Sequence, residues 1–396
     1  MFTLVDCNNF WSPSGGGVRR YHLEKMEYFK DRADVKYVFV MHDSETYTEQ
    51  IGSNAYIEHL KVPKVFGNWE YRYLTNSDRI APLLVKHDPD AIEIGSPYIM
   101  PRIVNNVVTK HHLKARVYGF WHADFPVTYV KRFLSGLPFS LDQRGEELAW
   151  AYARKNYNRM TGVLASSEII LDRMKLNGIE NTHFVPLGVN EVLFNPDKKD
   201  LSLVEELKAG DSNRLVMFFP HRFCKEKGLD VLLDAYPILC EKLNVEPTLV
   251  LAGMGPDIKR VQLAAEKYEH VRFKGFIQSK EEMATYYASA DLGFALSAWE
   301  TFGLSLVEAL SAGLPLIAAG DGAAKEHIDR SGAGYVLDTV TPENLAEMIV
   351  AFVNSSERVS FKVKAREYAK HLNWKNCFDK LLRIYQESGE EESIKK

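Results

Sequence analysis

The sequence lacks any long hydrophobic run. No window holds the roughly eighteen consecutive apolar residues from which a bilayer-spanning helix is built. The first residues, "MFTLVDCNNFW", lack the basic start and the apolar stretch of a secretion signal. We therefore expect a cytoplasmic protein, with any membrane contact being peripheral, at the inner face of the cytoplasmic membrane.

Cysteine and one-sided charge are also scarce. The 4 cysteines form no CxxC pair, which favours free thiols over a disulfide framework. The formal net charge of -4 gives no reason to expect nucleic acid as a partner. The GxGxxG and GxxxxGK[ST] fingerprints are missing, which disfavours an NAD-dependent oxidoreductase and a P-loop protein.

Short apolar runs alternate with longer amphipathic stretches, which predicts strands alternating with helices. Such alternation is typical of parallel sheets with right-handed crossovers. The predicted strands cover 35–41, 90–95, 115–122, 162–167, 183–188, 214–220, 247–253, 271–276, 291–297, 314–319 and 334–338. The predicted helices cover 17–31, 68–87, 144–160, 227–243, 259–268, 280–290, 305–313 and 342–354.

Two such series, separated by "GVNEVLFNPDKKD", predict two doubly wound α/β domains that face each other across a cleft. We expect an N-terminal domain over 1–188, a C-terminal domain over 189–372, and a last helix over 373–396. That helix is expected to pack back on the N-terminal domain and to end in a frayed tail. Ligands of such folds bind at the carboxyl ends of the strands.

Each predicted domain has one candidate phosphate-binding segment, which follows the first strand of that domain. In "SPSGGGVRRY", the glycines allow a ligand to approach the backbone, and the following helix offers free N–H groups. In "HRFCKEKGLD", Arg222 and Lys227 precede a helix that opens near Gly228 and suit a diphosphate. A flexible strand-to-helix connection explains the glycine segment as well as phosphate binding does. Ordinary surface cations likewise explain Arg222 and Lys227 as well as a diphosphate site does.

A third segment, "WETFGLSLVEALSAGLPLIA", places Glu300 in a loop and Glu308 inside a helix that starts at Gly303. The N–H groups of Leu304 and Ser305 would face a phosphate, helped by the helix dipole. Glu300 would accept hydrogen bonds from sugar hydroxyls, and Glu308 from the two hydroxyls of a ribose. Alternatively, Glu300 favours the helix start and Glu308 pairs with a lysine. Because this helix is apolar nearly all round, an unpaired buried Glu308 would be costly.

His122 in "GFWHADFPVTYV" closes a strand and is suited to proton transfer or hydrogen-bond donation. A purely structural histidine, oriented by Asp124, is the alternative. The one Asp-x-Asp spacing, Asp88 and Asp90 in "HDPDAIEIG", is interpreted as a helix-to-strand turn without a metal.

The segments "GGGVRRY", "HRFCKEKGLD" and "ETFGLSLVEALSAGLPLIA" together resemble the retaining glycosyltransferases of family 4. This family has the GT-B fold, two Rossmann-like domains, and uses nucleotide-diphosphate sugars. The resemblance implies acceptor binding by the first domain and donor binding by the second, with no metal and no cofactor. It implies these roles: catalytic, His122 and Glu300; donor diphosphate, Arg222, Lys227, Gly16, Gly17, Leu304 and Ser305; donor sugar, Glu300, Phe302 and Gly303; ribose and base, Glu308, Phe276 and Ile277.

In this family the acceptor attacks the face from which the nucleotide leaves, and the leaving phosphate assists its deprotonation. The resemblance to mannosyltransferases and sulfoquinovosyl-lipid synthases, in "GFWHADFPVTYVKRFLSGLP" and "AWAYARKNYNRMTGVLASS", implies GDP-mannose or a UDP-hexose as donor. The implied acceptor is a lipid, a lipid-linked glycan or a sugar.

Residues 102–159 carry ten Lys/Arg against four acids, interleaved with Phe125, Tyr129, Phe133, Phe139, Trp150 and Tyr157. This segment could dock on an anionic membrane, which would favour a lipid acceptor. The alternative is a solvated basic helix face with core aromatics, together with a small soluble acceptor. Three other functions stay open: a nucleotide-sugar epimerase of the same architecture, a pyridoxal-phosphate phosphorylase and a non-catalytic binding module.

Overall fold

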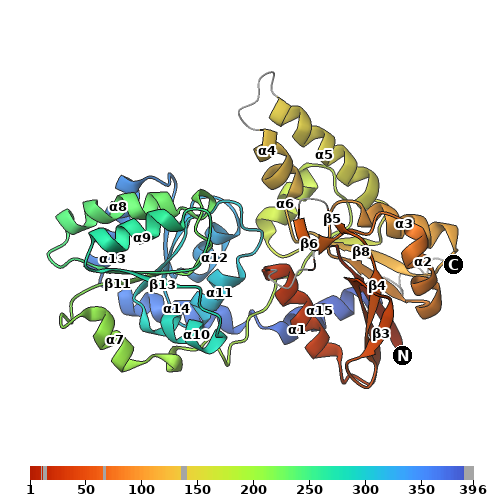
Figure 1. The fold of residues 1–396 in the computed structure, drawn as a ribbon, viewed down its shortest axis with the longest axis horizontal. Helices are drawn as coiled ribbons and strands as arrows, with labels where there is room; N and C mark the ends of the chain where they lie inside the picture. Colours follow the sequence, from red (N-terminus) through yellow and green to blue (C-terminus); the bar gives the residue numbers. More distant parts are fainter. Residues whose placement is uncertain (10, 12–15, 66–67, 135–140, 388–396) are drawn as a thin grey trace. The chain divides into compact units, whose positions relative to one another are not determined.

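The computed structural model describes the chain except residues 10, 12–15, 66–67, 135–140 and 388–396. The chain folds as two compact units (Figure 1). Unit 1 comprises Met1–Leu187 with Trp374–Lys396, and unit 2 comprises Gly188–Asn373. Each unit is an α/β fold around its own largely parallel sheet, as the alternation of strands and helices predicts.

Unit 1 is built on a sheet of eight strands in the order β10-β9-β8-β7-β1-β2-β4-β3. All neighbours are parallel except β3, which is antiparallel to β4 at the sheet edge. The strands are β1 (Phe2–Cys7), β2 (Val35–Asp43), β3 (Tyr47–Gln50), β4 (Ala55–Lys61), β7 (Ala91–Ile94), β8 (Arg116–Phe120), β9 (Gly162–Ala165) and β10 (Thr182–Phe184). The helices are α1 (Gly17–Phe29), α2 (Ser77–His87), α3 (Met100–Lys110), the π-helical turn η1 (Pro126–Lys131), α4 (Arg132–Leu134), α5 (Leu141–Tyr157), α6 (Glu168–Leu176) and α15 (Trp374–Glu387).

The single long helix predicted over 68–87 is wrong. Its first part is strand β6 (Asn68–Arg72), which pairs antiparallel with β5 (Lys64–Val65). The alternating aromatic sequence "NWEYR" favours an extended backbone. Helix α2 begins only after Asn76, whose side chain accepts a hydrogen bond from the Asp78 amide at 2.8 Å.

Unit 2 is built on a parallel sheet of six strands in the order β13-β12-β11-β14-β15-β16. The strands are β11 (Val216–Phe219), β12 (Thr248–Ala252), β13 (Val271–Gly275), β14 (Leu292–Ala295), β15 (Leu316–Ala319) and β16 (Gly334–Leu337). The helices are α7 (Leu201–Lys208), α8 (Leu229–Lys242), α9 (Ile258–Lys267), α10 (Lys280–Ser289), α11 (Leu304–Ser311), α12 (Ala323–Ser331), α13 (Pro342–Asn354) and α14 (Arg358–Lys370), with 3-10 turns η2 (Pro196–Lys198) and η3 (Lys225–Lys227).

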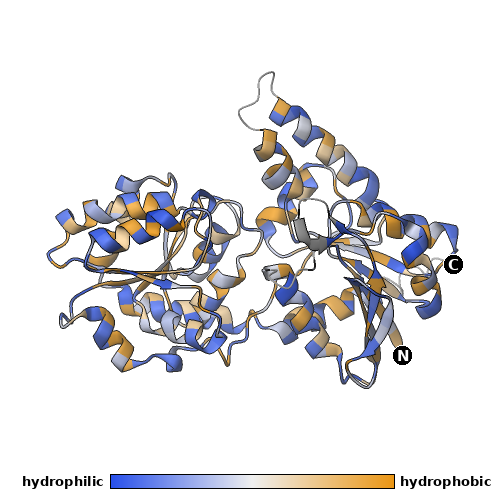
Figure 2. Ribbon diagram, viewed as in Figure 1, coloured by the Kyte–Doolittle hydropathy of each residue, from blue (hydrophilic) through white to orange (hydrophobic). Residues whose placement is uncertain are grey.

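Both sheets have hydrophobic cores, because their central strands are buried on both faces. The helices around them alternate hydrophobic and hydrophilic stretches (Figure 2), so that each buries one face. The four cysteines are free thiols, as predicted. Among the described residues, no helix has the length and apolar character needed to cross a bilayer.

The strand orders create one switch point in each sheet. Strand β1 lies between β2 and β7, and β11 lies between β12 and β14. In doubly wound sheets, the loops that leave the carboxyl ends of two such neighbouring strands diverge and open a crevice where ligands bind. The loops after β11 and β14 lie at this switch point of unit 2.

Candidate active site

The first loop of the unit 2 site follows β11 and carries His221, Arg222 and Lys227. It ends in the 3-10 turn η3 and in Gly228, which has φ 74° and caps α8. A Cβ on Gly228 would lie 2.6 Å from Cβ of Leu296, at the end of β14, so only glycine fits there. The two loops are thus held close together, and Gly228 opens the helix as predicted.

The second loop follows β14 and turns into α11 at Gly303. Gly303 adopts φ 81° and has no side chain to cap the first turn of the helix. The first turn of α11, at Leu304 and Ser305, thus begins without a side-chain cap, and the helix dipole favours negative charge there. Glu308 lies one turn further along α11 and is buried.

The central contact of the site is an ion pair between Lys227 and Glu300, one from each loop. Both side chains are 26% exposed, so the pair is only partly desolvated. Burial acts to raise the pKa of Glu300, but the charge of Lys227 and its hydrogen bond outweigh burial and hold that pKa below its ordinary value. Glu300 is therefore an anion at neutral pH, and Lys227 is its cation.

His221 is a site residue that the sequence reasoning missed. Its Nε2 lies 2.8 Å from the carbonyl oxygen of Phe294, to which it donates as a neutral imidazole. Burial, and then the charge of Lys227, lowers the pKa of His221 to about 4. The available signal was its place directly before Arg222, at the end of a strand.

One pocket brings several of the predicted residues together. Lys227, Glu300, Gly303 and Ser305 line it together with His221. The other predicted unit 2 residues lie outside this pocket. Arg222 is exposed on the first loop, Phe302 is buried before Gly303, Leu304 and Glu308 are on α11, and 66%-exposed Phe276 and buried Ile277 follow β13.

The remaining predicted residues belong to unit 1. Gly16 caps α1 and Gly17 is its first residue, whereas residues 12–15 of the same segment lie outside the described part of the chain. His122 stacks on Phe120 with ring centroids 4.2 Å apart and meets Tyr21 edge-on at 4.8 Å. Burial, then the nearby His22 and Lys25, lowers the pKa of His122 well below its ordinary value, so the ring is neutral.

Asp124 and Asp90 each contact a residue that the sequence did not indicate. Asp124, considered as its orienting partner, forms an ion pair with Arg173 of α6. Asp90 lies in the turn between α2 and β7, where its carboxylate accepts a hydrogen bond from the Thr3 amide at 2.7 Å. Asp88 and Asp90 therefore occupy the predicted helix-to-strand turn.

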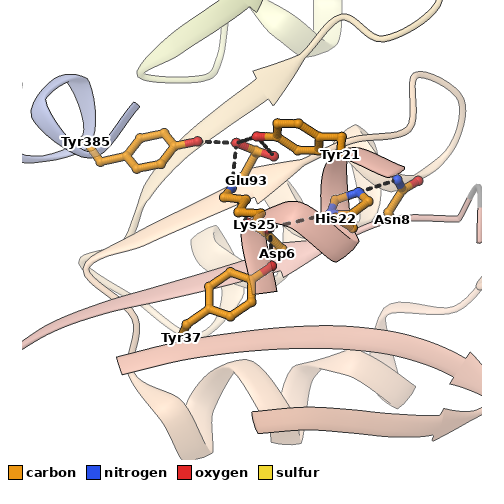
Figure 3. A network of polar contacts seen from close by, with 8 residues as sticks. All are labelled: Asp6, Asn8, Tyr21, His22, Lys25, Tyr37, Glu93 and Tyr385. Atoms are coloured by element: carbon orange, nitrogen blue, oxygen red, sulfur yellow. Dashed lines mark hydrogen bonds and ion pairs between the residues drawn. The ribbon is translucent and has the colours of Figure 1, made fainter. Parts of the chain in front are cut away.

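Beside His122, unit 1 contains a buried polar network that the sequence did not reveal (Figure 3). Lys25 of α1 donates hydrogen bonds of 2.9 Å to both Asp6 of β1 and Glu93 of β7, and all three side chains are fully buried. Tyr37 donates to Asp6 at 2.7 Å. Two acids and one lysine thus share one fully buried site.

Glu93 also receives hydrogen bonds from Tyr21 of α1 and from Tyr385 of α15. Burial raises the pKa of Glu93, an effect that the charge of Lys25 opposes without cancelling. For Asp6, the same burial is outweighed by Lys25 and His22, and its pKa is lowered. One carboxylate therefore links the first and the last helices of unit 1.

The aromatic residues of the 102–159 segment divide into two groups. Phe125, Trp150 and Tyr157 are core residues, as the alternative interpretation predicts. Tyr129 and Phe133 are exposed, by 48% and 84%. Phe139 lies outside the described residues.

Part of the chain is similar to a known protein family. Residues 205–371 match the family model of the glycosyl transferases group 1. The chain is 28% identical over 302 residues to a GDP-mannose-dependent alpha-(1-6)-phosphatidylinositol dimannoside mannosyltransferase of Mycobacterium tuberculosis, covering 74% of this chain and 73% of the relative.

Solved structures share the fold. Sucrose-phosphate synthase from Thermosynechococcus elongatus superposes with a TM-score of 0.73 at 15% identity, covering 97% of this chain and 98% of that one. HepE of Anabaena, solved in complex with UDP, gives 0.70 at 17% identity and covers 100% of both chains. Residues 205–371 are therefore similar to the group 1 glycosyltransferases, and the chain is an enzyme with the GT-B fold.

Proposed function

We propose that the chain transfers a hexose from a nucleotide-diphosphate sugar, without a metal and with retention of configuration. The observation that carries this proposal is the Lys227–Glu300 pair beside the amino end of α11. A cation and a free helix start suit a diphosphate, and an adjacent carboxylate suits the hydroxyls of a sugar. Lys227, Glu300, Gly303 and Ser305 all line one pocket, which supports this proposal.

Other residues of unit 2 would bind the remaining parts of the nucleotide. Arg222 on the same loop as Lys227 adds a second cation for the diphosphate. Glu308 on α11 would accept hydrogen bonds from the ribose, and Phe276 and Ile277 would contact the base. For Gly16, Gly17 and His122 of unit 1, the roles toward the diphosphate and the reacting sugar stay predictions.

In the proposed reaction, the bond between the anomeric carbon and the diphosphate oxygen breaks, and a bond to an acceptor hydroxyl oxygen forms on the same face. The acceptor proton passes to the leaving phosphate, so no protein nucleophile is needed. Lys227 and Arg222 would stabilise the negative charge that grows on the leaving diphosphate. The relatedness to a GDP-mannose-dependent enzyme makes GDP-mannose the first donor to test, with UDP-hexoses second.

A thermal-shift comparison of GDP, UDP and ADP tests this proposal. At a concentration about 100 times its Kd, the correct nucleotide should raise the melting temperature of unit 2 by roughly 5–10 °C. Lys227→Ala should remove most of this shift, and EDTA should leave it intact. Lys225→Ala is the matched control, because Lys225 is an exposed lysine of the same turn.

Two results would contradict the donor site. One is the absence of a shift with any of the three nucleotides. The other is an equal loss of the nucleotide-induced temperature shift in Lys225→Ala and in Lys227→Ala. That result would show that only the general positive charge of the loop matters. A shift or turnover that EDTA abolishes and Mg²⁺ restores would contradict metal independence.

We further propose that the acceptor is a lipid or lipid-linked glycan at an anionic membrane. Helices α4 and α5 lie side by side in unit 1 and expose Phe133 by 84% and Leu148 by 72%. Arg144 and Lys155 are exposed on α5, at helical spacing from Leu148. Apolar side chains flanked by cations are typical of a surface that docks on anionic lipid.

Vesicle flotation checks the membrane proposal. The chain should float with phosphatidylglycerol vesicles at low salt, and Phe133→Ser with Leu148→Ser should reduce the bound fraction several-fold. High salt should release it, because the Debye length shrinks from about 10 Å at 0.1 M to 3 Å at 1 M. Recovery of the chain in the unbound fraction at low salt would favour a small soluble acceptor instead.

A further inference from the structure

His327, on α12, makes two hydrogen bonds below the second loop of the unit 2 site. Its Nε2 lies 2.9 Å from the carbonyl oxygen of Phe302, and its Nδ1 lies 2.7 Å from the hydroxyl of Tyr368 on α14. The imidazole is buried and meets the Phe302 ring edge-on, with centroids 4.9 Å apart. His327 therefore contacts both the backbone carbonyl and the aromatic ring of Phe302.

The partners determine where the proton sits. A carbonyl oxygen can only accept, so Nε2 carries the hydrogen, and Nδ1 of the neutral ring accepts from the Tyr368 hydroxyl. Burial lowers the pKa of His327 to about 4, against the raising effect of the bond to Phe302. The ring is thus held in one tautomer and one orientation at neutral pH.

Helix α12 holds the loop at a second point. The amide of Ala323 donates to the carbonyl oxygen of Glu300 at 3.2 Å. A Cβ on Gly322, which has φ 78°, would lie 2.6 Å from the carbonyl oxygen of Ala298. Ala323 and His327 are one helical turn apart. Helix α12 therefore donates hydrogen bonds to the carbonyl oxygens of both Glu300 and Phe302.

We propose that His327 is a positioning residue for the donor site, which fixes the turn at Gly303 by holding the Phe302 carbonyl. The turn decides where α11 begins and which way its first N–H groups point. Through Glu300, two residues earlier, it also decides where the carboxylate of the ion pair lies. The inference deepens the proposed function, since the site it supports is the proposed donor site.

The alternative is that His327 merely fills the core. A leucine would fill a similar volume but leave the Phe302 carbonyl without its donor. A glutamine can place its amide nitrogen near the position of Nε2 and keep that donation. His327→Leu and His327→Gln therefore separate packing from hydrogen bonding, and Tyr368→Phe removes only the outer hydroxyl.

The experiment combines hydrogen–deuterium exchange over residues 298–308 with titration of GDP and UDP. We expect faster exchange and about tenfold weaker nucleotide binding in His327→Leu, an effect near two- to threefold in Tyr368→Phe, and rescue to within about twofold in His327→Gln. Tyr236→Phe, on α8, is the control. It also removes a buried hydroxyl that donates to a carbonyl oxygen, here that of Pro247 at 2.8 Å. It should lower the melting temperature without changing exchange at 298–308 or nucleotide binding.

The inference is overturned if His327→Leu exchanges and binds like the unmodified chain, or if His327→Gln is as impaired as His327→Leu. An equal effect of Tyr236→Phe on the loop would also overturn it, because general destabilisation would then suffice. If the unmodified chain binds none of GDP, UDP and ADP, the proposed function fails. The exchange data still decide whether His327 holds the loop.

Discussion

Replacing Lys25 by Met should lower the free energy of unfolding of unit 1 by about 3–5 kcal/mol. The ammonium group lies 2.9 Å from carboxylate oxygens of Asp6 and Glu93, and all three side chains are fully buried. Without it, two acids would face each other in a medium that solvates neither. They would have to take up protons or admit water, and both processes favour the unfolded state.

Lys30→Met is the matched control for this prediction. Lys30 directly follows α1 and forms an exposed ion pair with Glu27 at 2.7 Å. Exposed ion pairs contribute little to stability, so chemical denaturation should separate the two variants clearly. A Lys25→Met variant as stable as Lys30→Met would show that the network is hydrated in solution.

A second variant tests the cause of the loss. If uncompensated charge destabilises Lys25→Met, then adding Asp6→Asn and Glu93→Gln should recover much of the stability. If instead the lysine acts as a packing group, the triple variant should be worse than the single one. Tyr385 of α15 donates to Glu93, so exchange protection of α15 should follow the same order.

The network also shows where sequence reasoning ends. The loops that carry Lys227, Gly228 and Gly303 could be located, because each follows a short apolar strand and ends in a glycine. Those signals are local, spanning about ten residues. Asp6, Lys25, Glu93 and Tyr385 meet only after four elements have packed, and no pattern along the chain joins such distant positions.

The same reasoning explains the smaller misses. His327 gives no sign in "AAKEHID" of its contact with Phe302, which lies 25 residues earlier. His221 directly precedes Arg222 at the end of a predicted strand, but the sequence analysis assigns a role only to Arg222. The helix predicted over 68–87 is wrong in its first part, because only the residues after Asn76 are helical and Asn68–Arg72 form strand β6.

Glu300→Gln should lower kcat for sugar transfer by about 100-fold and at the same time tighten the binding of the nucleoside diphosphate alone. The loss follows because a neutral amide replaces the carboxylate that would hydrogen-bond the transferred sugar. The gain follows because Lys227 is paired with Glu300, so a diphosphate must compete with that carboxylate for the ammonium group. Most single variants weaken every ligand, so opposite changes in two quantities are a demanding test.

Isothermal titration with GDP or UDP, beside steady-state transfer kinetics, measures both quantities. We expect a Kd about three- to tenfold lower in Glu300→Gln, since a partly exposed ion pair contributes about 1 kcal/mol. Glu266→Gln, the same charge change at an exposed position on α9, should alter neither quantity. Weaker diphosphate binding in Glu300→Gln would mean that the carboxylate positions Lys227 for the ligand rather than competing with it. Unchanged turnover would remove Glu300 from the reaction and leave the ion pair as a contact between two loops.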